Sequence, residues 1–199
     1  MIKYIKVYKN QVPEELCLEL IDYIDTNPSI KSGINNGDVD NSVRDSESIF
    51  IPVKDCSKSL ELYEKITDIM YKCLKKYASE IQSPLFNDCF ELSHEMPSIM
   101  KYEKDKGFYN IHVDNFSFAS SMRVISAVIY LNDIDEGGET YFTEFDIKCK
   151  PEMGKILLFP SGFSYPHTAL TPVSNTKYSM VWWFTYPGFD INKIFGRSG

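Results

Sequence analysis

The sequence contains no long hydrophobic run and no excess of basic residues. Its apolar stretches are too short to span a bilayer, and the first residues, Met1-Ile-Lys-Tyr-Ile-Lys6, lack the hydrophobic region of a secretory signal. These absences predict a cytoplasmic protein without a membrane partner. The formal net charge of −7 argues against broad binding to a phosphate backbone, which requires a basic face. No nucleic-acid partner is therefore expected.

Paired cysteines are also missing, as are internal repeats and low-complexity segments. The five cysteines are scattered and form no Cys-x-x-Cys motif, which fits reduced thiols better than a disulfide framework or a zinc site. Cys17 and Cys73 fall on apolar faces of expected helices and are interpreted as core residues. Histidine is scarce too, with three in 199 residues, so a motif that uses two of them carries weight.

What the sequence does contain indicates one globular domain with a β-rich core. A length of 199 residues is enough for one sizeable core and too short for two comfortable ones. The contents of 43% hydrophobic and 14% aromatic residues suit a soluble protein rich in strands. We expect a single domain over residues 1–199, with helical support in about 1–80 and a β core in about 85–187.

Two helices and many short strands are expected. One helix begins at Val12-Pro-Glu-Glu15, because proline and acidic residues suit a first turn, and it ends at Asn27-Pro28. A second helix, 57–77, has a stripe of apolar residues that should face a sheet. This stripe is Leu60, Tyr63, Ile66, Met70, Leu74 and Tyr77. The short strands, at roughly ten-residue spacing, predict a mainly β, double-sheet fold with helical buttresses.

The polar segment Lys31–Ser48 interrupts the apolar pattern between the two helices. Its Asn35-Asn-Gly37 favours a hairpin turn, but the flanking residues are poorly apolar, so we expect a mobile loop or a loose hairpin. His94 has no second ligand-type residue at useful spacing and is expected at the surface.

Two histidines and one aspartate have the spacing of a metal site. Alternate side chains of an extended strand share a face, so His112 and Asp114 project to the same side. His167, which follows an apolar strand and a turn, can complete the set. Two imidazoles and one carboxylate form the facial triad of non-haem Fe(II) oxygenases, which leaves positions open for substrate and O2. A hydrolytic zinc site is the alternative, although it has no obvious general base and leaves Lys177 unexplained.

Lys177 begins the apolar run Lys177–Phe184, ten positions after His167. It shares a strand face with Ser179, Val181 and Trp183, and that face should point inward. A buried lysine needs an anionic partner. A dicarboxylate cosubstrate would supply that anion.

These elements together resemble the 2-oxoglutarate/Fe(II) dioxygenases of the prolyl 4-hydroxylase type, over a region from about Met100 to Tyr186. The shared pattern, in the family's order and spacing, is His112-x-Asp114, Tyr130-Leu-Asn132, Gly137-Gly-Glu-Thr140, Gly154, His167 and Lys177. The resemblance implies a distorted jelly roll, also called a double-stranded β-helix.

The resemblance also implies a reaction. Fe(II) would be held by His112, Asp114 and His167. The cosubstrates would be O2 and 2-oxoglutarate, which yields succinate and CO2 as a C–H bond is hydroxylated, with ascorbate as reductant. Because Asp114 is present where related halogenases carry a small residue, hydroxylation is favoured over halogenation.

The same resemblance places further residues around the cosubstrate and the substrate. The distal carboxylate of 2-oxoglutarate would pair with Lys177 and accept a hydrogen bond from Tyr130, and Tyr102 would contact the cosubstrate as in the oxygen-sensing subgroup. The strand positions of Tyr109 and Trp183 make them candidates for the substrate mouth, and Arg123 and Arg44 are further candidates. Core packing is the alternative for the two aromatics, and a surface charge is the alternative for Arg123. Arg44 belongs to an Arg-x-Ser motif in the segment 31–48, which would act as a lid; an ordinary surface loop is the alternative.

The expected function is hydroxylation of a protein or peptide side chain, with proline the favoured target on resemblance alone. The same chemistry on a free amino acid or another small molecule is one alternative. A jelly-roll module that binds metal or 2-oxoglutarate without turnover is another.

Overall fold

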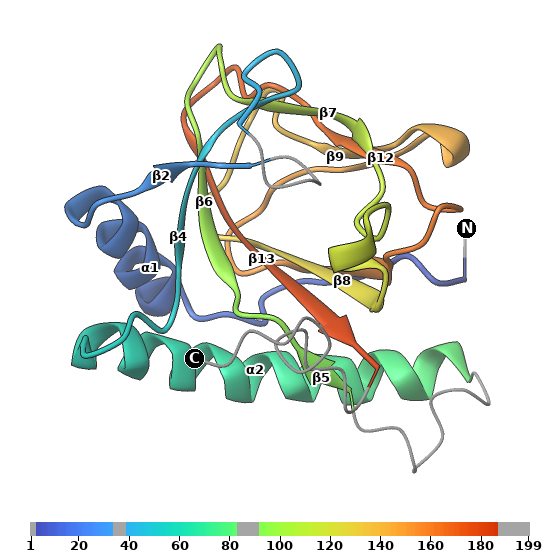
Figure 1. The fold of residues 1–199 in the computed structure, drawn as a ribbon, viewed down its shortest axis with the longest axis horizontal. Coiled ribbons are helices and arrows are strands. Elements are labelled where there is room, and N and C mark those ends of the chain that lie inside the picture. Colours follow the sequence, from blue (N-terminus) through green and yellow to red (C-terminus); the bar gives the residue numbers. More distant parts are fainter. Residues whose placement is uncertain (1–2, 34–38, 83–91, 187–199) are drawn as a thin grey trace.

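The computed structural model describes residues 3–33, 39–82 and 92–186. Within these ranges the chain forms two α-helices and two antiparallel β-sheets, and the helices lie beside the larger sheet (Figure 1). The expected mainly β jelly roll with helical buttresses is confirmed. No helix among the described residues is long and apolar enough to cross a membrane.

The larger sheet has eight strands, and its central strand β13 carries Lys177. Its order is β1 (Lys6–Tyr8), β11 (Ile156–Pro160), β8 (Arg123–Tyr130), β13 (Lys177–Thr185), β6 (Ser98–Tyr102), β4 (Glu47–Phe50) and β2 (Ile30–Lys31), with β5 (Ser93–His94) also paired to β13. Because side chains alternate along a strand, β8 and β13 each send one row toward the helices and one toward the smaller sheet.

The smaller sheet has five strands and carries the two metal-site histidines. Its order is β10 (Ile147–Cys149), β9 (Thr140–Phe142), β12 (His167–Ala169), β7 (Phe108–His112) and β3 (Arg44–Asp45). Short 3₁₀ turns at Phe118–Ser120 and Thr143–Phe145 connect strands. In Figure 1 the strands β7, β9 and β12 lie across from β8 and β13, on the side away from the helices.

Both helices begin where the sequence predicts. Helix α1 spans Glu14–Thr26, and helix α2 spans Ser57–Ile81, four residues beyond the predicted end. The predicted stripe of α2 is wrong at one position, since Leu60 is 46% exposed and Leu62 is fully buried. Residues that are two positions apart in an α-helix point to nearly opposite sides, so only one of these two leucines can face the sheet. The sheet contacts the side of Leu62.

Two hydrophobic clusters hold the layers together. The first joins the helices to the outer face of the larger sheet, and it includes Leu62, Met70, Ile99, Ile129 and Trp182. The second lies between the two sheets and includes Tyr130, Phe142, Leu157 and Phe159. The site described below lies between the sheets, beside this second cluster.

His94 is less exposed than predicted, and segment 31–48 contains paired strands. The His94 ring is half-buried against Trp182, with ring centroids 5.2 Å apart, and its Nε2 lies 3.3 Å from the Tyr63 hydroxyl, so the expected surface position is wrong. The two ends of segment 31–48 are paired antiparallel through β2 and β4, which agrees with the expected loose hairpin, and β3 within the segment pairs with β7. Its predicted turn at 35–37 lies outside the described residues.

Candidate metal centre and cosubstrate cavity

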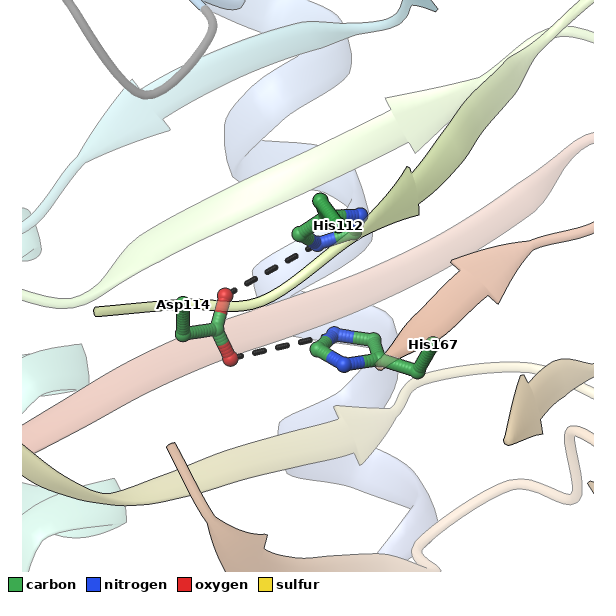
Figure 2. A group of neighbouring side chains, drawn as sticks. All are labelled: His112, Asp114 and His167. Carbon is green, nitrogen blue, oxygen red and sulfur yellow. Dashed lines mark ion pairs between the residues drawn. The ribbon is translucent and has the colours of Figure 1, made fainter. Parts of the chain in front are cut away.

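His112, Asp114 and His167 come together at one point, as the sequence predicts. His112 ends β7 and His167 begins β12, and the two residues are direct cross-strand partners. Such partners project to the same face of a sheet. Asp114 follows two residues after His112, and one donor atom from each of the three residues lies within 4.8 Å of the others. Figure 2 shows both rings pointing at the carboxylate.

The donor atoms of these three residues fit a metal ion. Nε2 of His112 lies 3.7 Å from Oδ1 of Asp114, and Nε2 of His167 lies 3.8 Å from Oδ2. These distances are too long for hydrogen bonds and leave space for an ion between the atoms. The Nδ1 atoms lie 2.7 Å from the Asn110 carbonyl oxygen and 3.1 Å from the Tyr165 carbonyl oxygen. A carbonyl only accepts, so each Nδ1 carries a hydrogen, and Nε2 is the ring nitrogen that each histidine can offer to a metal.

The charges of the site agree with that role. Burial, followed by the nearby His167, lowers the pKa of His112 to about 3, so its imidazole is neutral. Burial acts to raise the pKa of Asp114, but the neighbouring His167 and His112 and a hydrogen bond from Ser126 outweigh it and lower the pKa. Asp114 is therefore a carboxylate. Neutral imidazoles and a carboxylate are the forms that bind metals.

Lys177 lies deeper in the same cavity. Its side chain is buried, its ammonium donates to the Gly138 carbonyl oxygen at 2.7 Å, and its Nζ lies 5.0 Å from the centre of the Tyr102 ring. Among the described residues no carboxylate forms an ion pair with it. Burial lowers its pKa to about 8, against smaller opposing effects of Cys149 and Glu139. The cavity therefore contains a desolvated cation that an anion would stabilise.

The two tyrosines predicted at the cosubstrate occupy different positions. Tyr102 is a cross-strand partner of Lys177 and lines the cavity. Tyr130 is fully buried, and its hydroxyl donates to Oγ1 of Thr140 at 2.8 Å. Thr140, and not Tyr130, is among the residues that line the cavity. Sequence reasoning missed Thr140, although it belongs to the Gly137–Thr140 motif.

Arg44 and Tyr109 stack above the metal centre. The Tyr109 ring lies 3.6 Å from the His112 ring at an interplanar angle of 20°, and the Arg44 guanidinium lies 4.5 Å from the centre of the Tyr109 ring. Arg44 also donates to the Gly33 carbonyl oxygen at 2.8 Å. Arg44 of β3 thus brings the segment 39–48 into contact with the site.

Arg123 and Trp183 also meet at the site, but Arg123 is held by a partner that the sequence did not reveal. Nε and Nη2 of Arg123 donate to the two carboxylate oxygens of Glu95, both at 2.6 Å. Nη1 donates to the Asp114 carbonyl oxygen at 3.1 Å, and the guanidinium lies 3.7 Å from the centre of the Trp183 ring. Glu95 carries no pattern in the sequence that would have indicated this pairing.

A narrow inner cavity opens into a wider groove. The inner cavity, of about 50 Å³, contains the metal triad and Lys177. The groove, of about 620 Å³, extends over β2, β4 and β6. Arg44, Tyr109, Asp114 and Trp183 line both spaces. All four predicted substrate residues therefore line the groove, since Arg123 lines it as well.

Comparison with known protein sequences finds one matching family model and several curated relatives. The family model described as 2OG-Fe(II) oxygenase superfamily matches residues 97–185. Human prolyl 3-hydroxylase 1 is 27% identical over 150 residues, which cover 64% of this chain and 20% of the human protein. Human prolyl 3-hydroxylase 2 is 38% identical over 72 residues, which cover 34% of this chain and 10% of that protein. The matched region thus spans a fifth or less of these curated relatives.

Solved structures share the fold. A viral collagen prolyl hydroxylase from Paramecium Bursaria Chlorella virus-1, in its 2OG complex, has a TM-score of 0.69 at 20% identity, with 92% of this chain and 97% of that chain covered. A prolyl hydroxylase from Trichoplax adhaerens, in complex with a hypoxia inducible factor peptide fragment, has a TM-score of 0.76 at 15% identity, with 99% and 88% covered. The region from β6 to β13 is thus similar in sequence to the 2OG-Fe(II) oxygenase superfamily and to prolyl 3-hydroxylases, and the chain shares its fold with solved prolyl hydroxylases.

Proposed function

We propose that this protein is an Fe(II)/2-oxoglutarate-dependent hydroxylase. The observation that carries the proposal is one cavity that contains two imidazoles, one carboxylate and, deeper inside, a buried lysine with no carboxylate partner among the described residues. His112, Asp114 and His167 would bind one face of the Fe(II) ion. The bound ion and its cosubstrate 2-oxoglutarate would supply O2 activation and C–H hydroxylation, with release of succinate and CO2.

The residues around Lys177 suit the distal carboxylate of 2-oxoglutarate. Lys177 would pair with it, because an ammonium has three donors and Gly138 accepts one. The Thr140 hydroxyl accepts from Tyr130, so its own hydrogen is free to point into the cavity toward the carboxylate. Tyr130 would then act through Thr140, whereas Tyr102 would contact the cosubstrate from the opposite wall. Burial of these groups in the cavity would strengthen each of these contacts.

The groove outside the inner cavity supports a protein or peptide substrate. Its volume of about 620 Å³ exceeds what a single amino acid needs, and Tyr109 and Trp183 would flank the target side chain where groove and cavity join. A prolyl residue is the proposed target. Hydroxylation at C4 is expected from the sequence pattern, and the names of the curated relatives favour C3 as the second candidate. A free amino acid or another small molecule is the alternative substrate.

A turnover assay tests the proposal. With Fe(II), 2-oxoglutarate and ascorbate as the proposed reductant, proline-containing peptides should gain about 16 Da, one oxygen atom, as succinate forms. Amino-acid analysis then separates 3-hydroxyproline from 4-hydroxyproline. Oxidation of free amino acids with peptides untouched would contradict the peptide substrate. Metal and 2-oxoglutarate binding without succinate formation would support the non-catalytic module instead.

The setting of the reaction is also a proposal. We propose that residues 1–199 form one catalytic domain that works in the cytoplasm. The four described cysteines, Cys17, Cys56, Cys73 and Cys149, are free thiols, which fits a reducing compartment.

A further inference from the structure

A buried serine connects the metal triad to the larger sheet. Oγ of Ser126 donates to Oδ2 of Asp114 at 2.6 Å, and both side chains are buried. Asp114 follows β7 of the smaller sheet, whereas Ser126 lies in β8 of the larger sheet, between Phe159 of β11 and Trp183 of β13. A paired central strand is rigid. Ser126 therefore ties the carboxylate to a fixed point across the cavity.

A second serine fixes the direction of this hydrogen bond. Oγ of Ser161 lies 2.8 Å from Oγ of Ser126, and Ser161 is also buried. A carboxylate only accepts, so the single hydrogen of Ser126 is committed to Asp114, and the hydrogen between the serines comes from Ser161. The backbone N–H of Ser161 donates to the Val124 carbonyl oxygen at 3.1 Å, which holds it beside β8.

Each residue of the metal triad thus has one outer partner. His112 and His167 are oriented by the carbonyls of Asn110 and Tyr165, and Asp114 is oriented by Ser126. Outer partners of this kind fix the ligand orientation and typically affect metal affinity by about 10- to 100-fold. The hydrogen bond also affects how Asp114 would bind a metal. When a hydroxyl donates to one carboxylate oxygen, binding of the metal through the other oxygen alone is favoured over chelation through both.

We propose that Ser161 and Ser126 form a relay of two hydroxyls that positions Asp114 to bind Fe(II) through one oxygen. The inference rests on the proposed function, since it takes His112, Asp114 and His167 as the ligands. One-oxygen binding would leave room on the ion for 2-oxoglutarate and O2. Ser126 and Ser161 are positioning residues, because they act through Asp114.

Metal titration without turnover tests the relay. Ser126→Ala should weaken Fe(II) binding under anaerobic conditions by about 10- to 100-fold and change the visible spectrum of bound Co(II), used as a spectroscopic substitute. Ser126→Thr keeps a hydroxyl and should restore both. Ser98→Ala is the matched control: Ser98 is a buried serine of the same sheet whose hydroxyl contacts the Met100 sulfur. Wild-type affinity and spectrum in Ser126→Ala would overturn the proposal.

A double-mutant cycle of Ser126 and Ser161 gives a second test. Ser161→Ala should weaken Fe(II) binding less than Ser126→Ala, because the bond to Asp114 stays. In the Ser126→Ala background the same change should have no further effect, since the relay is already broken. Additive losses would overturn the relay. If the wild-type protein itself bound neither Fe(II) nor Co(II), the proposed function would fail instead, so the two failures are distinguishable.

Discussion

Lys177 donates to the carbonyl oxygen of Gly138 at 2.7 Å, inside a cavity that it shares with the metal triad. The bond holds the ammonium at the inner end, with Tyr102 on one side and Tyr130 on another. An ammonium in this position is costly to keep charged without an anion. The cavity would therefore suit the proposed ligand, which has a carboxylate at one end and a metal-binding group at the other.

Replacement of this lysine should separate cosubstrate binding from metal binding. Lys177→Met removes the charged partner of the distal carboxylate, and loss of a buried partner costs about 3–5 kcal/mol. We expect the KM for 2-oxoglutarate to rise at least about 100-fold, while anaerobic Fe(II) binding changes little. Lys155→Met is the control, because Lys155 is equally buried but pairs with Glu152 outside the cavity. Equal effects of the two substitutions would contradict the role of Lys177.

The lowered pKa of Lys177 predicts a pH-dependent stability of the ligand-free protein. Burial lowers this pKa from 10.5 to about 8, so between these values the unfolded chain binds one proton more than the folded chain. The contribution of Lys177 to the free energy of unfolding therefore rises from about pH 8 to 10.5. Lys177→Met should be more stable than wild type below pH 8 by on the order of 3 kcal/mol, and this advantage should shrink as pH rises. Chemical denaturation at several pH values measures it; a constant difference would contradict the prediction.

The two adjacent tryptophans should have different roles. Trp183 lines the cavity and the groove, whereas Trp182 is buried against the helices. Trp183→Ala should raise the KM for a peptide substrate by about tenfold or more, because an aromatic wall of the mouth is lost, with little change in the KM for 2-oxoglutarate. Trp182→Phe should lower the unfolding temperature and leave both KM values near wild type. The reverse pattern would show that Trp183 does not contact substrate.

The Glu95–Arg123 pair should matter more for the site than for stability. The two side chains are 33% and 16% exposed, so the ion pair contributes about 1 kcal/mol to the free energy of unfolding. Arg123, however, also holds the Asp114 carbonyl and stacks on Trp183. Glu95→Gln should therefore increase the KM for peptide several-fold with only a small loss of stability in urea. A large loss of stability with unchanged KM would assign the pair to folding alone.

Residues whose roles depend on strand periodicity could be predicted from the sequence. His112 and Asp114 are two apart on a strand, and Lys177, Ser179 and Val181 alternate onto the cavity wall as expected. The start of α1 at Glu14 follows from Pro13 and the acidic first turn. In each case a local pattern decides the position, so no knowledge of the tertiary structure is needed.

Residues whose roles depend on partners distant in the sequence could not be predicted. Ser126 and Thr140 have no local pattern that marks them as site residues. Their roles come from partners on the opposite side of the cavity, the Asp114 carboxylate for Ser126 and the Tyr130 hydroxyl for Thr140. Leu60 and Leu62 both have helical spacing, and only the packed sheet selects Leu62. The two-residue strand β3 is stabilised by pairing with β7, more than sixty positions along the chain, which no local propensity indicates.

The central claim is that His112, Asp114 and His167 bind Fe(II) in the same cavity that accepts 2-oxoglutarate. Anaerobic titration of the protein with Fe(II) and 2-oxoglutarate tests it, because chelation of Fe(II) by the keto acid produces a weak visible charge-transfer band. We predict that the wild-type protein and His94→Ala, whose substitution lies outside the site, develop the band with saturation, and that His112→Ala does not. A band of equal intensity in His112→Ala, or no band in the wild-type protein, would contradict the account.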